Sequence, residues 1–246
     1  MVPTPRGLHG VLVHELGRQI ADRIYHAGDV LSPDETGKQF DASRPTVREA
    51  LRVLESKGML RIRQSWGTRV QPPEEWNLLD PEVVGWRLHG RDRDHQIREL
   101  VEMRLAVEPI AASLAASKQD LDSLQTLESA WAAMQIALED RDVHTFTEAD
   151  VAFHAALLRG SGNQMFDRLT ALISTALEAR EETLNQHHAD VSREALEQHR
   201  VVLQAVVNGA GDLAKKTMDE MLRGLLTEPV GAPAQPTDQP AKAAVG

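Results

Sequence analysis

Residues 42–51 of this chain, Ala-Ser-Arg-Pro-Thr-Val-Arg-Glu-Ala-Leu, constrain its architecture more than any other segment. Small polar and cationic residues come first, and an apolar stripe at helical spacing follows them. Ser43 is a good N-cap, and Pro45 suits the first helical turn after such a cap. The segment therefore predicts a helix over residues 44–57 that Gly58 terminates.

The neighbouring segments complete a known arrangement of elements. Apolar residues at helical spacing predict a first helix over 8–26, and Pro33 opens a short second helix over 33–40. After the helix described above, the alternating residues 60–63 and the return segment 69–71 predict two strands joined by a turn. Helix, turn, helix and β-hairpin in this order form a winged helix–turn–helix.

The first turn of the helix over 44–57 has the chemistry of a DNA reader. Arg44 and Arg48 lie four positions apart on one face, and a guanidinium can bond both O6 and N7 of guanine. Solvated arginines on an ordinary surface helix are the alternative, but the order of the elements favours DNA. The predicted DNA contacts are Ser43, Arg44, Thr46, Arg48, Gly67 and Thr68.

The formal net charge of −10 is distributed unevenly along the chain. Residues 1–72 hold 11 Lys and Arg against 8 Asp and Glu, whereas the remainder holds 16 against 29. Between residues 44 and 69 the ratio is 7 to 2. Because salt screens charges beyond about 8 Å, DNA phosphates respond to this local excess of cations. A small basic module joined to a large acidic one is therefore compatible with DNA binding.

Composition excludes several other classes of protein. The chain has no cysteine, which excludes disulfide scaffolds, thiolate metal sites and thiol catalysis. The chain has no run of about 18 apolar residues, which a membrane-spanning helix would need. Its N-terminus lacks the apolar core of a signal peptide. We therefore expect a soluble, cytoplasmic protein without membrane contact.

The pattern divides the chain into four parts. The winged helix–turn–helix occupies 1–73, a connector with two tryptophans occupies 74–94, an all-helical unit occupies 95–228, and the tail 229–246 is expected to be disordered. Two tryptophans in so short a connector indicate that it packs between the domains. The fold class is thus mostly α, with an N-terminal winged helix–turn–helix and a C-terminal, all-α antiparallel helical bundle.

Periodicity in the third part predicts its individual helices. They lie near 95–117, 120–141, 145–160, 164–187, 190–208 and 211–227. Asp120, Thr145 and Asn163 are the expected N-caps.

Three motifs in the first part resemble the signature of GntR-family bacterial transcription regulators. They are Ser43-Arg44-x-x-Val47-Arg48-Glu49-Ala50-Leu51, Gly58-Met59-Leu60 and Gly67-Thr68-x-Val70. The resemblance implies a homodimer that binds double-stranded, palindromic operator DNA. The segment 35–38 is atypical, because Gly37 within a short helix costs about 1 kcal/mol relative to alanine. No DNA contact is carried over from that segment.

The second half resembles FCD, the all-helical ligand-binding domain of the FadR subfamily. The matching pieces are Arg104-x-x-Val107-Glu108-Pro109, Asp150-x-x-Phe153-His154, Gly162-Asn163, and Glu197-x-His199 followed by Gly211-Asp212. In that family the helices enclose a polar cavity, where an Asp and three His typically bind a divalent metal and often a small carboxylate effector. The resemblance implies Asp150, His154 and His199 as ligands of Zn²⁺, Ni²⁺ or Mn²⁺.

The residue types support this metal site in part. Asp150 and His154 lie four apart and both suit these ions, although such a pair is often an ordinary surface pair. His199 lies in an apolar pattern, where a histidine is often only a satisfied core residue. The usual fourth ligand falls on Met221, whose thioether is a poor ligand for Zn²⁺ or Mn²⁺. We predict a three-residue site completed by water or effector oxygens, or a weak site that is often empty.

Arg104 and Asn163 are the predicted effector contacts. Arg104 faces the bundle core in the family pattern, and a buried arginine needs an anion. Two anions are equally good candidates: the carboxylate of an effector, and the carboxylate of Glu108, which lies one turn later and would form a salt bridge. Open metal positions would also suit a 2-hydroxy acid, which can chelate through its carboxylate and hydroxyl groups.

The connector motif Trp76-Asn77-x-Leu79-Asp80-Pro81, ahead of Arg98-x-Leu100, resembles the branch that governs sugar-acid catabolism. It implies a repressor of a gluconate- or galactonate-type operon that an aldonate releases. A regulator that responds to another small carboxylate, such as lactate, is one alternative. A metal-dependent enzyme is another, with His187-His188 as an unplaced candidate base. We expect no enzymatic activity.

Overall fold

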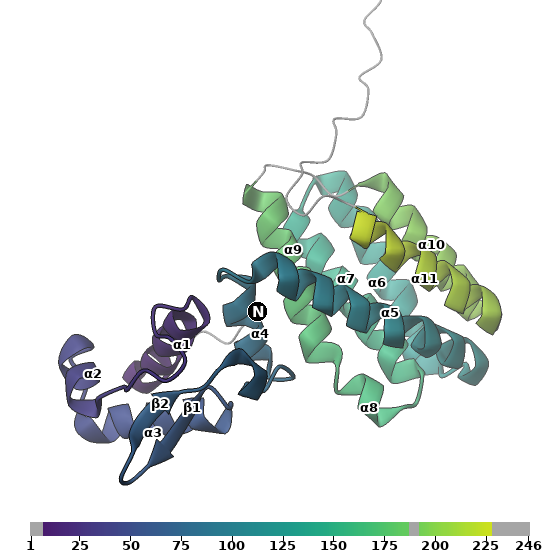
Figure 1. Cartoon of the computed structure of the whole chain (residues 1–246). Coiled ribbons are helices and arrows are strands. Elements are labelled where there is room, and N and C mark those ends of the chain that lie inside the picture. Colours follow the sequence, from purple (N-terminus) through teal and green to yellow (C-terminus); the bar gives the residue numbers. More distant parts are fainter. Residues whose placement is uncertain (1–6, 187–191, 228–246) are drawn as a thin grey trace, which may run out of the picture.

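The structure is a computed structural model that describes residues 7–186 and 192–227. Figure 1 shows a small N-terminal unit that contains both strands and a larger unit built of helices. The tail 229–246 and the pair His187-His188 lie outside the described residues. Within the described ranges, no helix is long and apolar enough to cross a bilayer.

The small unit is the predicted winged helix–turn–helix. Its elements are α1 (Gly7–Ala21), α2 (Pro33–Gln39), α3 (Arg44–Ser56), β1 (Leu60–Arg63) and β2 (Gly67–Val70). Ser43 caps α3 as predicted, since its hydroxyl accepts a hydrogen bond from Thr46 N. The first helix is shorter than predicted: it ends at Ala21, because Arg23 takes a positive φ of 59° and Ile24 finds no place in the core.

The apolar stripe of α3 holds this unit together. Its buried residues are Val47, Ala50, Leu51 and Leu54, all at most 1% exposed, and they cluster with the inner face of α1. The strands are antiparallel, with Leu60 opposite Val70. A hydrogen bond of 2.7 Å from Ile62 N to the Glu55 carboxylate ties β1 to the end of α3. The hairpin and α3 therefore form one body.

The turn between α2 and α3 explains the unusual glycine at position 37. Ala42 N donates to Gly37 O across 2.9 Å, which closes the chain tightly after α2. A Cβ atom at Gly37 would lie 2.9 Å from the Ala42 carbonyl oxygen, too close for a side-chain carbon. Glycine therefore permits the backbone contact that sets α2 against α3, and this offsets its poor helix propensity.

The connector packs between the two units, as its tryptophans predicted. Its elements are the 3-10 turn η1 (Pro73–Glu75) and α4 (Pro81–Leu88). Trp76 and Trp86 belong to the core of the winged unit, and Trp86 Nε1 donates to Nδ1 of His14 on α1 at 3.1 Å. Val84 and Leu88 instead join a cluster with the larger unit. Helix α4 is thus shared by both cores.

The larger unit is the predicted antiparallel bundle. Its helices are α5 (Arg93–Lys118), α6 (Leu121–Asp140), α7 (Val143–Gly160), α8 (Gln164–Asp167), α9 (Thr170–Gln186), α10 (Arg193–Val207) and α11 (Gly211–Thr227). The single helix predicted over 164–187 is wrong: α8 and α9 are separate, and Phe166 and Leu169 pack into different clusters. The N-cap predicted at Thr145 is also wrong, because the Asp142 carboxylate accepts from Thr145 N at 3.0 Å and starts α7 earlier.

Helix α7 packs against α5, α6 and α9 and carries both apolar and polar buried side chains. Phe153 and Leu157 are 0% exposed and pack with α6 and α10 in the main apolar cluster. Asp150 and His154 are buried on the same helix. Because a buried charge is costly unless it is paired, both side chains must find partners on neighbouring helices.

We predict that Gly37→Ala destabilises the protein by about 1–3 kcal/mol, the usual cost of an extra carbon in packed space. Helix propensity alone predicts the opposite sign, about 1 kcal/mol of stabilisation. Gly224→Ala in α11 is the matched control, because a Cβ there would meet nothing within 4 Å. Urea unfolding followed by circular dichroism measures both free energies. Equal stability of the two variants would contradict the close contact at Gly37.

Candidate functional site

Three polar side chains meet inside the helical bundle. Asp150 and His154 lie one turn apart on α7, and His199 faces them from α10. They are 5%, 1% and 4% exposed, respectively. One ligand atom from each lies within 4.8 Å of the other two, so a single ion can reach all three. The structure thus brings together the three metal ligands predicted from two distant parts of the sequence.

Both imidazoles turn the same nitrogen toward the carboxylate. His154 Nε2 lies 3.1 Å from Asp150 Oδ1, and His199 Nε2 lies 3.0 Å from the same oxygen. The opposite nitrogens are held as well: His199 Nδ1 donates to Ala195 O at 2.7 Å, and His154 Nδ1 binds the Glu108 carboxylate. Such a second hydrogen bond orients the ring of a metal-binding histidine.

Arg104 and Glu108 extend this cluster from α5. They are 3% and 0% exposed. Arg104 Nε donates to Glu108 Oε1 at 2.6 Å, and Arg104 Nη2 lies 3.1 Å from His154 Nε2. Of the two anions considered for Arg104, Glu108 is present in the structure. The sequence offered no signal for the contact between Glu108 and His154, because it joins residues 46 positions apart on different helices.

Burial and charge oppose each other in this cluster, and charge prevails. Burial raises the pKa of Glu108, but Arg104 and His154 outweigh it and lower that pKa to about 2. Burial also opposes ionisation of Asp150, yet His199 and His154 hold its pKa well below the usual range. Burial lowers the pKa of His154, but Glu108 and Asp150 raise it overall. At neutral pH both carboxylates are therefore charged.

Four members of the cluster line a cavity of about 280 Å³ between α5, α7, α9, α10 and α11, namely Arg104, Asp150, His154 and His199. Polar groups also line it, namely Arg180, Ser192, Glu194 and Gln198. Met221 lines the same cavity and is 6% exposed, so the thioether lies in the region where the sequence placed it. Four of the five helices thus contribute a polar group, and α11 contributes the sulfur.

The donor set fits a divalent transition metal. Two imidazole nitrogens and a carboxylate oxygen suit Zn²⁺, Ni²⁺ or Mn²⁺, and the thioether of Met221 adds little affinity for the hard ions among them. With neutral imidazoles, Arg104, Glu108 and Asp150 together carry one net negative charge. A divalent ion would reverse the sign of the cluster, and a net positive charge in a cavity attracts an anionic ligand.

Asn163, the other predicted effector contact, does not join the cluster. Its Oδ1 accepts a hydrogen bond from Met165 N at 3.0 Å and caps α8. It is not among the residues that line the cavity. The predicted N-cap at Asn163 is confirmed, whereas the geometry lends no support to an effector contact there.

The first turn of α3 is open to solvent on the winged unit. Arg48 is exposed and has no ion-pair partner among the described residues. Arg44 is exposed too, but its guanidinium binds both carboxylate oxygens of Asp34 on α2. The hydroxyls of Ser43 and Thr46 lie 2.8 Å apart. Arg48 is therefore available to DNA as it stands, whereas Arg44 must first leave Asp34.

The hairpin tip differs from the prediction at two residues. Gly67 takes a φ of +79°, as its place in a tight turn requires, but β2 turns the Thr68 side chain inward and leaves it 6% exposed. Trp66 was missed: it is 45% exposed, with the guanidinium of Arg69 at 4.7 Å and that of Arg63 at 5.7 Å from its ring. The available signal was an aromatic residue in a turn between arginines. Aromatic and cationic groups of this kind suit a nucleic-acid surface.

Comparisons with known proteins assign both units to described families. Residues 9–70 match the bacterial regulatory proteins of the gntR family, and residues 99–224 match the FCD domain. The galactonate operon transcriptional repressor of Escherichia coli (strain K12) is 30% identical over 213 residues, which cover 86% of this chain and 92% of the relative. The regulator YieP of the same strain is 29% identical over 222 residues, which cover 89% and 94%.

Solved structures show the same likeness. Streptococcus agalactiae GntR is 27% identical, with a TM-score of 0.50 and coverage of 88% of this chain and 98% of that one. Lar, which controls the expression of the Listeria monocytogenes agr system, has a TM-score of 0.60 over 89% of this chain and 95% of that one. At 19% identity, Lar shows a likeness of fold alone. The matched families and the curated relatives are regulators of transcription, not enzymes.

We predict that His199→Ala lowers the affinity of the protein for divalent metal by about 10–100-fold or more, since a ligand is worth at least as much as a residue that orients one. His199 is chosen over His154 because its Nδ1 binds only a backbone carbonyl, whereas that of His154 binds the buried carboxylate of Glu108. His144→Ala is the control, since His144 is exposed and does not line this cavity. Elemental analysis after dialysis against Zn²⁺, Ni²⁺ or Mn²⁺ gives the amount of metal bound per chain. Equal metal in wild type and His199→Ala would exclude the three-residue site.

Proposed function

This chain belongs to the GntR family of bacterial regulatory proteins and has an FCD domain, and we propose that it represses a sugar-acid catabolic operon and leaves the DNA when an aldonate binds. The observation that carries the proposal is the buried cluster of Asp150, His154, His199, Arg104 and Glu108. Charged and hydrogen-bonding groups converge there beside a cavity, which is the setting that a small carboxylate needs.

The DNA-binding half of the proposal rests on α3 and the hairpin. The apolar stripe of α3 faces the core, so Arg48 is left on the outer face with Arg44. A recognition helix reads the major groove with its first turn, and a homodimer would read the two halves of a palindrome. The basic excess between residues 44 and 69 supplies attraction to phosphate.

The effector half rests on the chemistry of the cavity. Arg104 and Arg180 supply positive charge, and Ser192 and Gln198 supply groups that can bond hydroxyls. A bound divalent ion would add direct coordination of a carboxylate and a neighbouring hydroxyl oxygen. At about 280 Å³ the space is at the small end for ligand cavities, which favours a short polar acid over a long acyl chain. The likeness to a galactonate operon repressor points in the same direction, and lactate is the alternative effector.

Helix α4 offers the route from the cavity to the DNA. Arg104 and Glu108 lie on α5, which follows α4 directly, and α4 packs on both α1 and α9. An effector can release DNA only if it binds one arrangement of the two units better than the other. Movement of α5 around a bound carboxylate would reach α1 through α4 and change the position of α3.

We predict that Arg48→Ala weakens operator binding by about 1–3 kcal/mol per half-site, the value of one bidentate guanine contact. Arg200→Ala on α10 is the control, because it removes the same charge from the surface of the other unit. Fluorescence anisotropy measures the affinities of both variants for a DNA duplex that was selected from a random library with the wild-type protein. Undiminished affinity of Arg48→Ala would refute the role given to the first turn of α3.

The effector contact needs a paired substitution. Removing Arg104 alone would leave the buried Glu108 charge without its permanent cation, at a cost of about 3–5 kcal/mol. In Arg104→Gln with Glu108→Gln, both side chains become neutral amides, the first shorter than arginine and the second equal in size to glutamate. We expect this variant to bind the operator with normal affinity. Its release should require a galactonate concentration about tenfold or more above that for the wild type, since a charge-assisted hydrogen bond is lost.

Galactonate, gluconate and lactate are each titrated into the protein–operator complex of the paired variant and of the wild type. Elemental analysis of the same preparations shows whether the metal ligands still function. Release of the variant at wild-type galactonate concentrations would exclude Arg104 as the carboxylate contact. A wild type that responds to lactate alone would move the proposal to that effector.

A further inference from the structure

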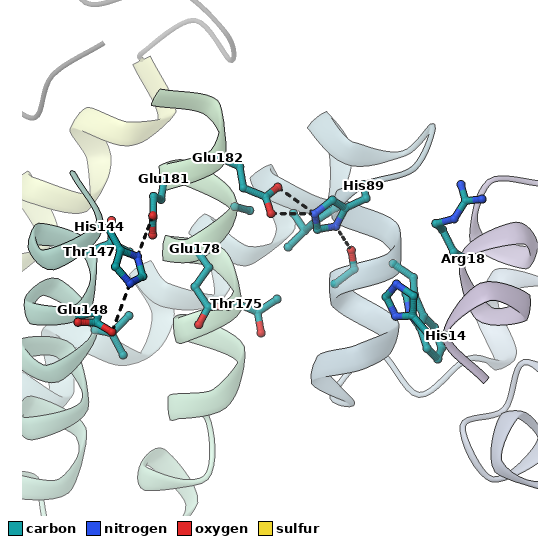
Figure 2. A pocket seen from close by; sticks show the side chains of 15 residues that line it. His14, Arg18, His89, His144, Thr147, Glu148, Thr175, Glu178, Glu181 and Glu182 are labelled. Carbon is teal, nitrogen blue, oxygen red and sulfur yellow. Dashed lines mark hydrogen bonds and ion pairs between the residues drawn. The ribbon is translucent and has the colours of Figure 1, made fainter. Parts of the chain in front are cut away.

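A second and larger cavity, of about 680 Å³, lies between the winged unit and the helical bundle. Figure 2 shows the side chains around it: His14 and Arg18 come from α1, His89 from the end of α4, and the facing wall is formed by α7 and α9. No residue that lines this cavity also lines the one beside Asp150. Its volume is in the range of small-molecule sites, which often form where two domains meet.

The walls combine an apolar surface with carboxylates. Trp86, Leu88, Val151 and Ala179 supply the apolar part. The acidic part consists of Glu148 on α7 and of Glu178, Glu181 and Glu182 on α9. Arg18 is the permanent cation among the lining residues, and it already binds Glu15 at 2.8 Å and Asp22 at 3.0 Å. The cavity is therefore acidic, with a surface that can bury an apolar group.

Nitrogen donors already approach these carboxylates in the structure. His89 Nε2 lies 2.8 Å from Glu182 Oε2, and His144 Nδ1 lies 3.0 Å from Glu181 Oε1. His144 Nε2 lies 3.5 Å from Glu148. Figure 2 shows both imidazoles at the carboxylates of this wall. The carboxylates are thus placed to receive N–H donors, and a ligand ammonium can take the position that an imidazole holds.

The wall made by α7 and α9 separates the two cavities. On α7, Glu148 and Val151 line the inter-domain cavity, whereas Asp150 and His154 line the other one. On α9, the residues around Glu178 and Glu182 line the inter-domain cavity, whereas Leu177 and Arg180 line the other one. A ligand between the domains would therefore touch the two helices that also shape the Asp150 cavity, and α1, which packs on α3.

We propose that this inter-domain cavity is a second ligand site, which takes a small organic cation with an apolar body, such as a primary ammonium on an aromatic or branched alkyl group. The ammonium binds Glu182 where the His89 imidazole lies, or Glu181 where the His144 imidazole lies, because these two carboxylates point to opposite sides of α9. The apolar body packs on Leu88, Val151 and Ala179. Binding itself is independent of the proposed function. Its consequence, a change in operator affinity, rests on that function, because a ligand that contacts both units favours one arrangement of them.

The probe is 2-phenylethylammonium, and 2-phenylethanol is its neutral counterpart of nearly equal size. Isothermal titration of the full chain should give an affinity for the ammonium about tenfold higher than for the alcohol, the ratio expected from one charge-assisted hydrogen bond. The variant Glu181→Gln with Glu182→Gln should lose that advantage and bind both compounds alike. These substitutions keep the side-chain size and the acceptor for each histidine, so folding should be unaffected.

The matched control is Glu128→Gln with Glu139→Gln. It makes the same charge change at two exposed residues of α6 that line neither cavity. Its affinity for the ammonium should equal that of the wild type. Equal binding of the two probes by the wild type would overturn the proposal, as would full ammonium affinity in the Glu181 and Glu182 variant.

Operator affinity is measured on the same preparations with and without the ammonium. Failure of the protein to bind any selected duplex, or to release it with a sugar acid, would count against the proposed function and leave the titration result standing. Selective ammonium binding that depends on Glu181 and Glu182 supports the second site in either case. A change in operator affinity with the ammonium, absent in the variant, establishes its coupling to DNA.

Discussion

The carboxylate of Glu108 holds the polar centre of the helical bundle together. It is 0% exposed, and it binds the guanidinium of Arg104 on its own helix and the imidazole of His154 on α7. His154 in turn faces Asp150, and Asp150 faces His199 on α10. Charges buried this deeply are tolerated only when each has a partner. One continuous set of hydrogen bonds and ion pairs therefore ties three helices together and presents two imidazole nitrogens and an oxygen to a cavity.

The helices around this cluster lie close to the elements that join the two units. Helix α7 carries Asp150 and His154 on one side and lines the inter-domain space on another. Helix α4 belongs to both cores, through Trp86 on one face and Leu88 on the other. Because packed cores shift as units and do not deform gradually, the coupling proposed between the cavity and α3 would run through α4. The proposed switch would thus use a helix that belongs to the cores of both units.

Local patterns predicted most of the fold and part of the site. The N-cap at Ser43, the buried stripe of α3 and the hairpin are confirmed, because each depends on residues a few positions apart in a regular element. The pairing of Asp150 with His154 also follows from the spacing of one helical turn. The errors arose where distant packing decides. Ile24 continues the apolar pattern of α1 but finds no core, and Phe166 and Leu169 belong to different clusters although their pattern is continuous.

Residue types and spacings alone predicted a winged helix–turn–helix, a helical bundle and a DNA-reading first turn, and the resemblance to the FCD domain implied the residues that a metal would use. They did so because helix and strand geometry is local and the motifs are short. The contact of Glu108 with His154, the inward turn of Thr68, the exposure of Trp66 and the acidic space between the domains depend on how separate elements pack. Side chains that are far apart in the chain meet only after the whole core has set the distances between helices. For this reason the chemistry of the cavity could be anticipated from its ligands, but its charge balance and its link to the DNA-binding unit required the folded molecule.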